Sequence, residues 1–105
     1  LISVTIDPAT FKFSDTVEEV VLNKSALGVG ISLDGGRGSV YGDRPIVVKS
    51  VFEGTEAAKS GSLHVGDKIL RIGDTDITGM SYVEASKVLR SSPKGPLKLT
   101  FKKRL

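Results

Sequence analysis

The chain contains no cysteine, and its only histidine is His64. Without cysteine it can form neither disulfide bonds nor thiolate metal sites, a composition that suits a reducing compartment. It also lacks an apolar run long enough to span a bilayer, and no signal-peptide pattern is visible. These absences exclude a disulfide framework and a helix that crosses a membrane.

Catalytic and metal-binding motifs are also lacking. His64 has no Gly-x-Ser-x-Gly context that would supply an activated nucleophile, and no Gly-Lys-Ser/Thr follows the glycine-rich residues 35–44. Residues 74–85 begin like a calcium-binding loop but place Ala85 where a bidentate glutamate is required. We therefore expect no enzymatic activity, no metal and no cofactor.

Size and charge are those of an ordinary globular domain. The 105 residues are 39% hydrophobic and 26% charged, which predicts one domain that folds alone. The formal net charge of +3 is compatible with anionic peptide termini or a membrane surface, but it is too small to indicate nucleic acid. Because the chain begins with Leu1 rather than methionine, we expect it to be part of a larger protein.

A glycine-rich turn, Gly28-Val29-Gly30-Ile31, is the most distinctive stretch of the sequence. Glycine reaches backbone angles that strain other residues, so the two glycines predict a loop that turns several N–H groups toward one point. Lys24 precedes Gly28 by four residues and adds a positive charge. Residues 31–34 then alternate apolar and polar side chains, as a half-buried strand does. The stretch predicts an anion-binding loop beside a strand edge.

Two helices and six strands are predicted in total. Thr55 and Gly61 are typical of the N-cap and the left-handed C-cap of a short helix over 56–60. Ser81 and Glu84 form the pattern of a capping box, which predicts a helix over 82–91 whose face turns toward the strand at 31–34. Alternating or β-branched residues predict strands over 17–22, 31–34, 46–52, 68–72, 75–77 and 97–103.

Residues 1–16 stand apart from this pattern. Val4-Thr5-Ile6 and Phe11-Lys12-Phe13 show the short alternation of a strand. The sequence leaves two interpretations open, an appended strand that packs on the domain and a flexible linker.

Two segments together resemble the PDZ domain. Gly28-Val29-Gly30-Ile31, with Lys24 ahead and Gly35-Gly36 behind, is similar to the Gly-Leu-Gly-Phe loop of that family. Residues 45–72, which include Val65-Gly66-Asp67-Lys68-Ile69-Leu70, resemble the family's third strand, short helix and fourth strand in order.

The resemblance covers residues 17–103. It implies a mainly β fold with two helices, a small, partly open antiparallel β-barrel or sandwich of five to six strands, formed by residues 17–105. The sequence departs from the family pattern at two places. Gly73-Asp74 stands where Asn-Gly is usual, and Val29 and Ile31 replace the commoner Leu and Phe. Both replacements keep the ligand pocket apolar while altering its shape.

The function implied by the resemblance is to bind the free C-terminus of another protein. The peptide would add as an antiparallel strand between the 31–34 strand and the 82–91 helix. Its terminal carboxylate would accept hydrogen bonds from the N–H groups of Val29, Gly30 and Ile31, with Lys24 near by. Its last side chain, a Val, Leu or Ile, would enter a hydrophobic pocket. The residues expected to line that pocket are Val29, Ile31, Leu33 and Leu89.

Selectivity is expected to come from polar residues along the groove, above all Tyr82. Family members with histidine at this position prefer Ser or Thr two residues before the ligand terminus. The Tyr82 hydroxyl can donate to a carboxylate, which favours Asp or Glu there, with Ser or Thr as the alternative. The other residues expected to contribute to selectivity are Ser32, Asp34, Lys49 and Ser86.

A second interpretation is a module that binds anionic phospholipid. The last strand has a lysine-rich face at Lys98 and Lys102, and Lys102-Lys103-Arg104 could act with Arg90 and Lys94 on lipid headgroups. In either case the resemblance implies a cytoplasmic scaffold protein, at the inner face of the plasma membrane or at cell junctions. Its partners would be membrane receptors, channels or signalling proteins, and nucleic acid is not expected.

Overall fold

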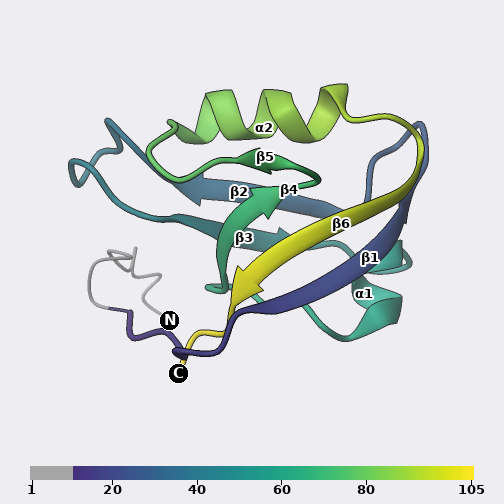
Figure 1. Ribbon diagram of the computed structural model, residues 1–105, viewed down its shortest axis with the longest axis horizontal. Helices are drawn as coiled ribbons and strands as arrows, with labels where there is room; N and C mark the ends of the chain where they lie inside the picture. Colours follow the sequence, from purple (N-terminus) through teal and green to yellow (C-terminus); the bar gives the residue numbers. More distant parts are fainter. Residues whose placement is uncertain (1–10) are drawn as a thin grey trace, which may run out of the picture.

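The structure, a computed structural model, describes residues 11–105 and contains six strands and two helices (Figure 1). The strands and helices predicted over residues 17–103 all form, and each bound agrees with the prediction to within a few residues. In chain order the elements are β1 (Glu18–Lys24), β2 (Ile31–Gly35), β3 (Ile46–Val51), α1 (Glu56–Ser60), β4 (Lys68–Ile72), β5 (Thr75–Asp76), α2 (Tyr82–Ser91) and β6 (Gly95–Lys102).

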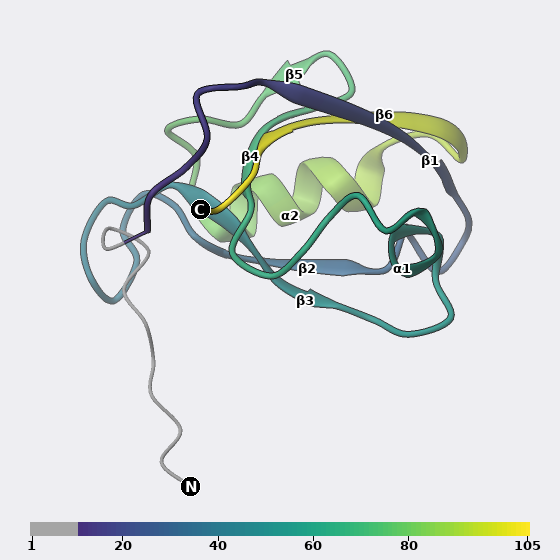
Figure 2. The same ribbon diagram turned by 90° about the horizontal axis from the view of Figure 1, so that it is seen from below.

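The strands form one antiparallel sheet with the order β1-β6-β4-β3-β2, and β5 pairs with β4 outside this path. The sheet does not close, because β1 and β2 at its two ends do not pair with each other. Helix α2 packs against β2 and the short α1 against β1, as the two perpendicular views show (Figures 1 and 2). The predicted fold class, a partly open β structure with two helices, is confirmed.

The core is filled by one face of the curled sheet and by the inner side of each helix. Leu97, Leu99 and Phe101 alternate along β6 and are all buried, as a strand with one covered face requires. Ala57 of α1 and Ala85 of α2 are completely buried. The two helices therefore cover the core near the two ends of the sheet order, α1 at β1 and α2 at β2.

Both helices begin and end at the residues that the sequence predicts. The Thr55 side chain accepts from the N–H of Ala58, and Gly61 ends α1 with φ +66°. Ser81 and Glu84 complete the capping box at the start of α2. Since a cap satisfies N–H groups that have no partner inside the helix, these local sequence signals fix the helix bounds.

The part of the N-terminal extension that is described pairs with the end of the chain. The N–H of Ser14 donates to the Lys103 carbonyl at 2.8 Å, and the N–H of Leu105 donates to the Lys12 carbonyl at 2.7 Å. Phe13 and Arg104 form an antiparallel bridge between these two contacts. The predicted strand at Val4-Thr5-Ile6 lies outside the described residues.

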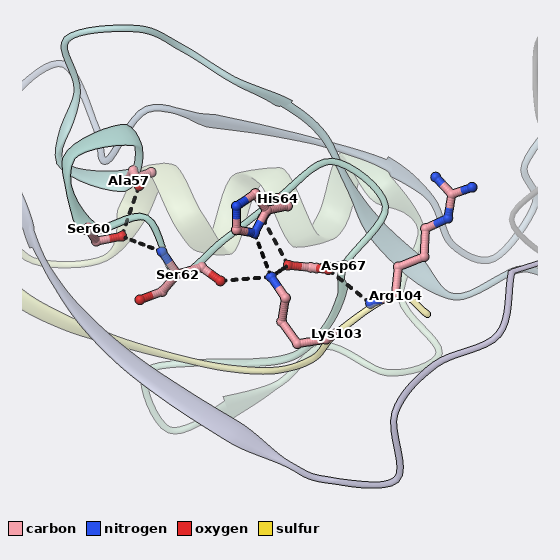
Figure 3. Close-up of polar contacts among 7 residues, drawn as sticks. All are labelled: Ala57, Ser60, Ser62, His64, Asp67, Lys103 and Arg104. Atoms are coloured by element: carbon pink, nitrogen blue, oxygen red, sulfur yellow. Dashed lines mark hydrogen bonds and ion pairs between the residues drawn. The ribbon is translucent and has the colours of Figure 1, made fainter.

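A buried carboxylate joins the loop between α1 and β4 to the residues after β6 (Figure 3). Asp67 is 1% exposed, and its carboxylate accepts from Lys103 Nζ at 2.5 Å and from the N–H groups of His64 and Arg104, both at 2.9 Å. Lys103 Nζ also donates to the Ser62 carbonyl at 2.9 Å and lies 2.7 Å from His64 Nδ1. Since an ammonium group only donates, His64 Nδ1 accepts, which assigns the ring proton to Nε2.

Candidate functional site

A groove of about 360 Å³ runs between β2 and α2. Both apolar and polar side chains line it. The lining residues are Ile31, Ser32 and Leu33 of β2, Lys49 of β3, and Tyr82, Ser86, Leu89 and Arg90 of α2.

The strand that borders this groove has an unpaired edge. β2 ends the sheet order, and its ladder to β3 shows which backbone groups are free. Ile31 faces Val51, and the flanking bond runs from the N–H of Phe52 to the carbonyl of Gly30 at 2.9 Å. This is the pattern of a non-hydrogen-bonded antiparallel pair, in which both residues turn their N–H and C=O groups away from each other. The N–H and C=O of Ile31 therefore point toward the open edge.

Leu33 repeats this arrangement two residues further on. Its partner on β3 is Val48, whose N–H donates to the Asp67 carbonyl and whose carbonyl accepts from the N–H of Gly66. The N–H and C=O of Val48 thus bond to the residues just before β4 and not to Leu33. The N–H and C=O of Leu33 therefore face the open edge. The groove side of β2 offers two donors and two acceptors at a spacing that matches an added strand.

The loop before β2 directs unpaired N–H groups to the same end of the groove. The carbonyls of Val29 and Gly30 accept from the N–H groups of Ala57 and Phe52, at 3.0 and 2.9 Å. Among the described residues, the N–H groups of Val29 and Gly30 donate to no acceptor. With the N–H of Ile31 they make a run of three donors without a partner, which is the chemistry of an anion-binding nest.

Gly30 is required at its position for a reason that the sequence did not reveal. Its φ is +97°, and a Cβ at this position would lie 2.0 Å from Thr55 Oγ1, the N-cap side chain of α1. A side chain here would both strain the backbone and displace the cap. The sequence alone predicts that a β-branched residue at Gly30 abolishes binding and leaves the fold largely intact. The contact with Thr55 leads us to expect that such a residue also destabilises the fold.

The expected hydrophobic pocket is formed in part. Ile31, Leu33 and Leu89 line the groove together, from facing sides of β2 and α2. Val29 does not line it, because its side chain is only 2% exposed and packs in the core. In the Gly28-Val29-Gly30-Ile31 turn, the first apolar side chain thus faces inward and the second faces the groove.

Lys24, expected near a bound carboxylate, is engaged elsewhere. It is 6% exposed, and its Nζ donates to the carbonyls of Arg90 and Ser92 at 2.6 and 2.5 Å. Both carbonyls belong to the end of α2, where helix carbonyls lack partners within the helix. Arg90, considered from the sequence only as a contact for lipid, is instead a lining residue of the groove.

The residues expected to provide selectivity are mostly brought together. Tyr82 is the first residue of α2 and is 47% exposed at the groove, with Ser86 one turn further along the helix. Ser32 and Lys49 lie on the opposite wall. Asp34 does not line the groove, and its carboxylate accepts from the N–H of Gly35 at 2.8 Å.

The loop between β2 and β3 is tied to the Tyr82 end of the groove. The N–H of Arg37 donates to the Met80 carbonyl at 2.9 Å, and its guanidinium forms an ion pair with Glu84. This partner lies 47 residues away in the chain, so no local sequence pattern indicates it. Hydrogen bonds from Ser81, and to a smaller extent the charge of Arg37, hold the pKa of Glu84 below its ordinary value of 4.5.

A hollow of similar size, about 340 Å³, lies on another part of the surface. Its walls include Ile46 of β3 and Ile69 of β4. Both strands lie inside the sheet order and pair on both sides. This hollow therefore offers no free strand edge to a peptide, and the β2–α2 groove is the better candidate site.

Three of the basic residues expected to contact lipid form contacts within the domain. Lys98 forms an ion pair with Glu19 at 3.2 Å, and Lys103 is bound to Asp67. The guanidinium of Arg104 stacks over the Phe11 ring, 4.1 Å from its centroid.

Comparison with known proteins decides the family. A sequence model of the PDZ domain matches residues 19–102. The chain belongs to the PDZ family. The fold and the loop-strand-helix groove described above are therefore those of a PDZ domain, a non-enzymatic module for protein–protein interaction.

Similar proteins and structures agree with this assignment. PDZ domain-containing protein 2 of Homo sapiens is 40% identical over 80 residues, which are 76% of this chain and 3% of that protein. Pro-interleukin-16 of Saimiri sciureus is 35% identical over 89 residues, 85% of this chain and 14% of that protein. The crystal structure of Dlg1 PDZ2 from the choanoflagellate Monosiga brevicollis has a TM-score of 0.75 at 25% identity and covers 84% of this chain and 99% of its own.

The chain thus spans a small fraction of the length of these curated relatives. Within residues 11–105, neither helix has the length and apolar character needed to cross a membrane.

Proposed function

We propose that this PDZ domain binds the free C-terminal tail of a partner protein, which adds as an antiparallel strand to β2 beside α2. The observation that carries the proposal is the free edge of β2, where the backbone groups of Ile31 and Leu33 face the groove. Backbone hydrogen bonds to this edge would give affinity that does not depend on the ligand sequence.

The terminal carboxylate is held by the loop before β2. The N–H groups of Val29, Gly30 and Ile31 are the donors, and hydrogen bonds to an ionised acceptor are stronger than those between neutral groups. An internal peptide or an amidated one lacks this acceptor. The site therefore distinguishes a free C-terminus from other extended segments.

The last side chain of the ligand enters the apolar part of the groove between Ile31, Leu33 and Leu89. A Val, Leu or Ile fits this lining, and burial of such a side chain contributes about 1.5–3 kcal/mol. A few net hydrogen bonds add about 0.5–1.5 kcal/mol each before the cost of ordering the peptide is subtracted. The expected affinity is near micromolar, or about −8 kcal/mol.

Tyr82 selects the ligand residue two before the terminus. Its hydroxyl donates to an Asp or Glu side chain there, and Ser or Thr is the competing preference. Ser86, Ser32 and Lys49 line the same groove and tune the choice at neighbouring positions. Receptors, channels or signalling proteins with such tails in the cytoplasm, at the plasma membrane or at cell junctions, are the expected partners.

A titration of ¹⁵N-labelled protein with paired peptides tests the proposal. Each peptide ends in Val, Leu or Ile and is added once as the free acid and once as the C-terminal amide. Free acids should shift the amide signals of residues 29–33 and Tyr82 and should bind at least about tenfold more tightly than the amides. Equal binding of both forms would contradict carboxylate recognition, and shifts confined to other surfaces would contradict the groove.

A further inference from the structure

The end of helix α2 holds two cations whose surroundings differ. Lys24 is buried, and two of the three donors of its ammonium are used by the carbonyls of Arg90 and Ser92. A positive charge at a helix C-terminus is also favourable because of the helix dipole. If Lys24 moved toward a ligand, both carbonyls would lose their donor. Its contacts are those of a residue that holds the helix end in place.

Arg90, in contrast to Lys24, is exposed, and its side chain has no such contacts within the described part of the chain. Its side chain is exposed, and its guanidinium forms no hydrogen bond or ion pair with the described residues. It lines the β2–α2 groove and also an adjoining hollow of about 330 Å³ that Lys24 and Gly28 share. It therefore lies where the groove adjoins residues 26–28, directly before the residues whose N–H groups are unpaired.

Within residues 11–105, no acidic side chain lines either the groove or the adjoining hollow. A guanidinium presents two parallel donors that match the two oxygens of a carboxylate. Among the described residues that line both the groove and the adjoining hollow, Arg90 is the one with a charged side chain, so an anion at this end of the groove can meet its guanidinium.

We propose that Arg90 binds the terminal carboxylate of the ligand directly, and that Lys24 acts as a positioning residue that fixes the end of α2. The proposal rests on the function proposed above, since it assigns a residue to the same carboxylate. Arg90 then contributes to the selection of free C-termini over internal segments.

The test compares the free-acid and amide forms of one peptide on the intact domain. Arg90→Gln should weaken binding of the free acid about tenfold and leave the amide almost unchanged, so that the acid-to-amide ratio of affinities falls. The matched control is Lys87→Gln, which removes an exposed charge from the same helix outside the groove lining and should keep the ratio. Arg90→Lys keeps the charge but lacks the two parallel donors of a guanidinium, and it should give an intermediate acid-to-amide ratio.

A variant of Lys24 separates the two roles. Lys24→Gln should lower the urea midpoint and shift the amide signals at the end of α2, while the acid-to-amide ratio stays near that of the wild type. If the acid-to-amide ratio of affinities falls in Lys24→Gln and stays at the wild-type value in Arg90→Gln, the proposal is overturned and Lys24 is the carboxylate ligand. A wild-type protein that does not distinguish acid from amide overturns the proposed function as well.

Discussion

The buried pair of Asp67 and Lys103 should be one of the largest single contributions to stability in the domain. Asp67→Asn removes the charge and turns an amide group toward donors that previously met a carboxylate. Breaking a buried ion pair by changing one partner costs about 3–5 kcal/mol. Because the Lys103 side chain is 27% exposed, we expect the lower end, about 3 kcal/mol.

Urea denaturation followed by circular dichroism measures this cost. With a slope of about 2 kcal/mol per molar urea, a loss of about 3 kcal/mol lowers the midpoint by about 1.5 M. Lys103→Met should cost a similar amount, because it leaves the carboxylate without its cation. The double variant should be about 2 kcal/mol more stable than the sum of the single changes predicts, since the two groups interact directly.

The Glu19–Lys98 pair is the matched control, because it joins the same kinds of charge on the surface. Its side chains are 55% and 47% exposed, and such pairs contribute about 0–1 kcal/mol. A coupling energy for Asp67 and Lys103 no larger than that of the surface pair would refute the reasoning.

Three further predictions concern the groove and its supports. Tyr82→His should shift preference two residues before the ligand terminus toward Ser or Thr by about tenfold in a peptide array, and an unchanged profile would defeat the selectivity assigned to Tyr82. Gly30→Val should cost at least about 2 kcal/mol in urea denaturation, because it strains a positive φ and displaces the Thr55 cap; a stability within about 0.5 kcal/mol of wild type would contradict this. The folded-state pKa of Glu84 lies below its ordinary value of 4.5, so its contribution to stability is present above that pH and is lost as the pH falls through the folded-state pKa. The difference in urea midpoint between wild type and Glu84→Gln should therefore shrink between about pH 7 and about pH 3, and a constant difference would argue against this role.

Local signals explain why the helices were predictable to the residue. Thr55, Gly61, Ser81 and Glu84 act on N–H or C=O groups within a few positions, so their pattern is visible in the sequence. The free edge of β2 was also predictable in outline, from the turn and the alternation that follow Lys24.

Contacts between distant residues were not predictable in the same way. Lys24 reaches a carbonyl 66 positions away, and Asp67 meets a lysine 36 positions away. One sequence pattern does indicate that Lys103 needs an anionic partner. Lys103 follows β6 and continues the alternation of Leu97, Leu99 and Phe101, which places a cation on the covered side of the sheet, where it needs an anionic partner. Only the folded chain shows that Asp67 supplies it.

Amide hydrogen exchange at β2 tests the central claim most directly. In the free domain, the amides of Ile31 and Leu33 face an open edge and should exchange fast, whereas the amide of Ser32 between them bonds to β3 and should be protected. A saturating C-terminal peptide should slow exchange at Ile31 and Leu33 by at least about tenfold and leave Ser32 nearly unchanged. Binding without new protection at Ile31 and Leu33 would contradict strand addition.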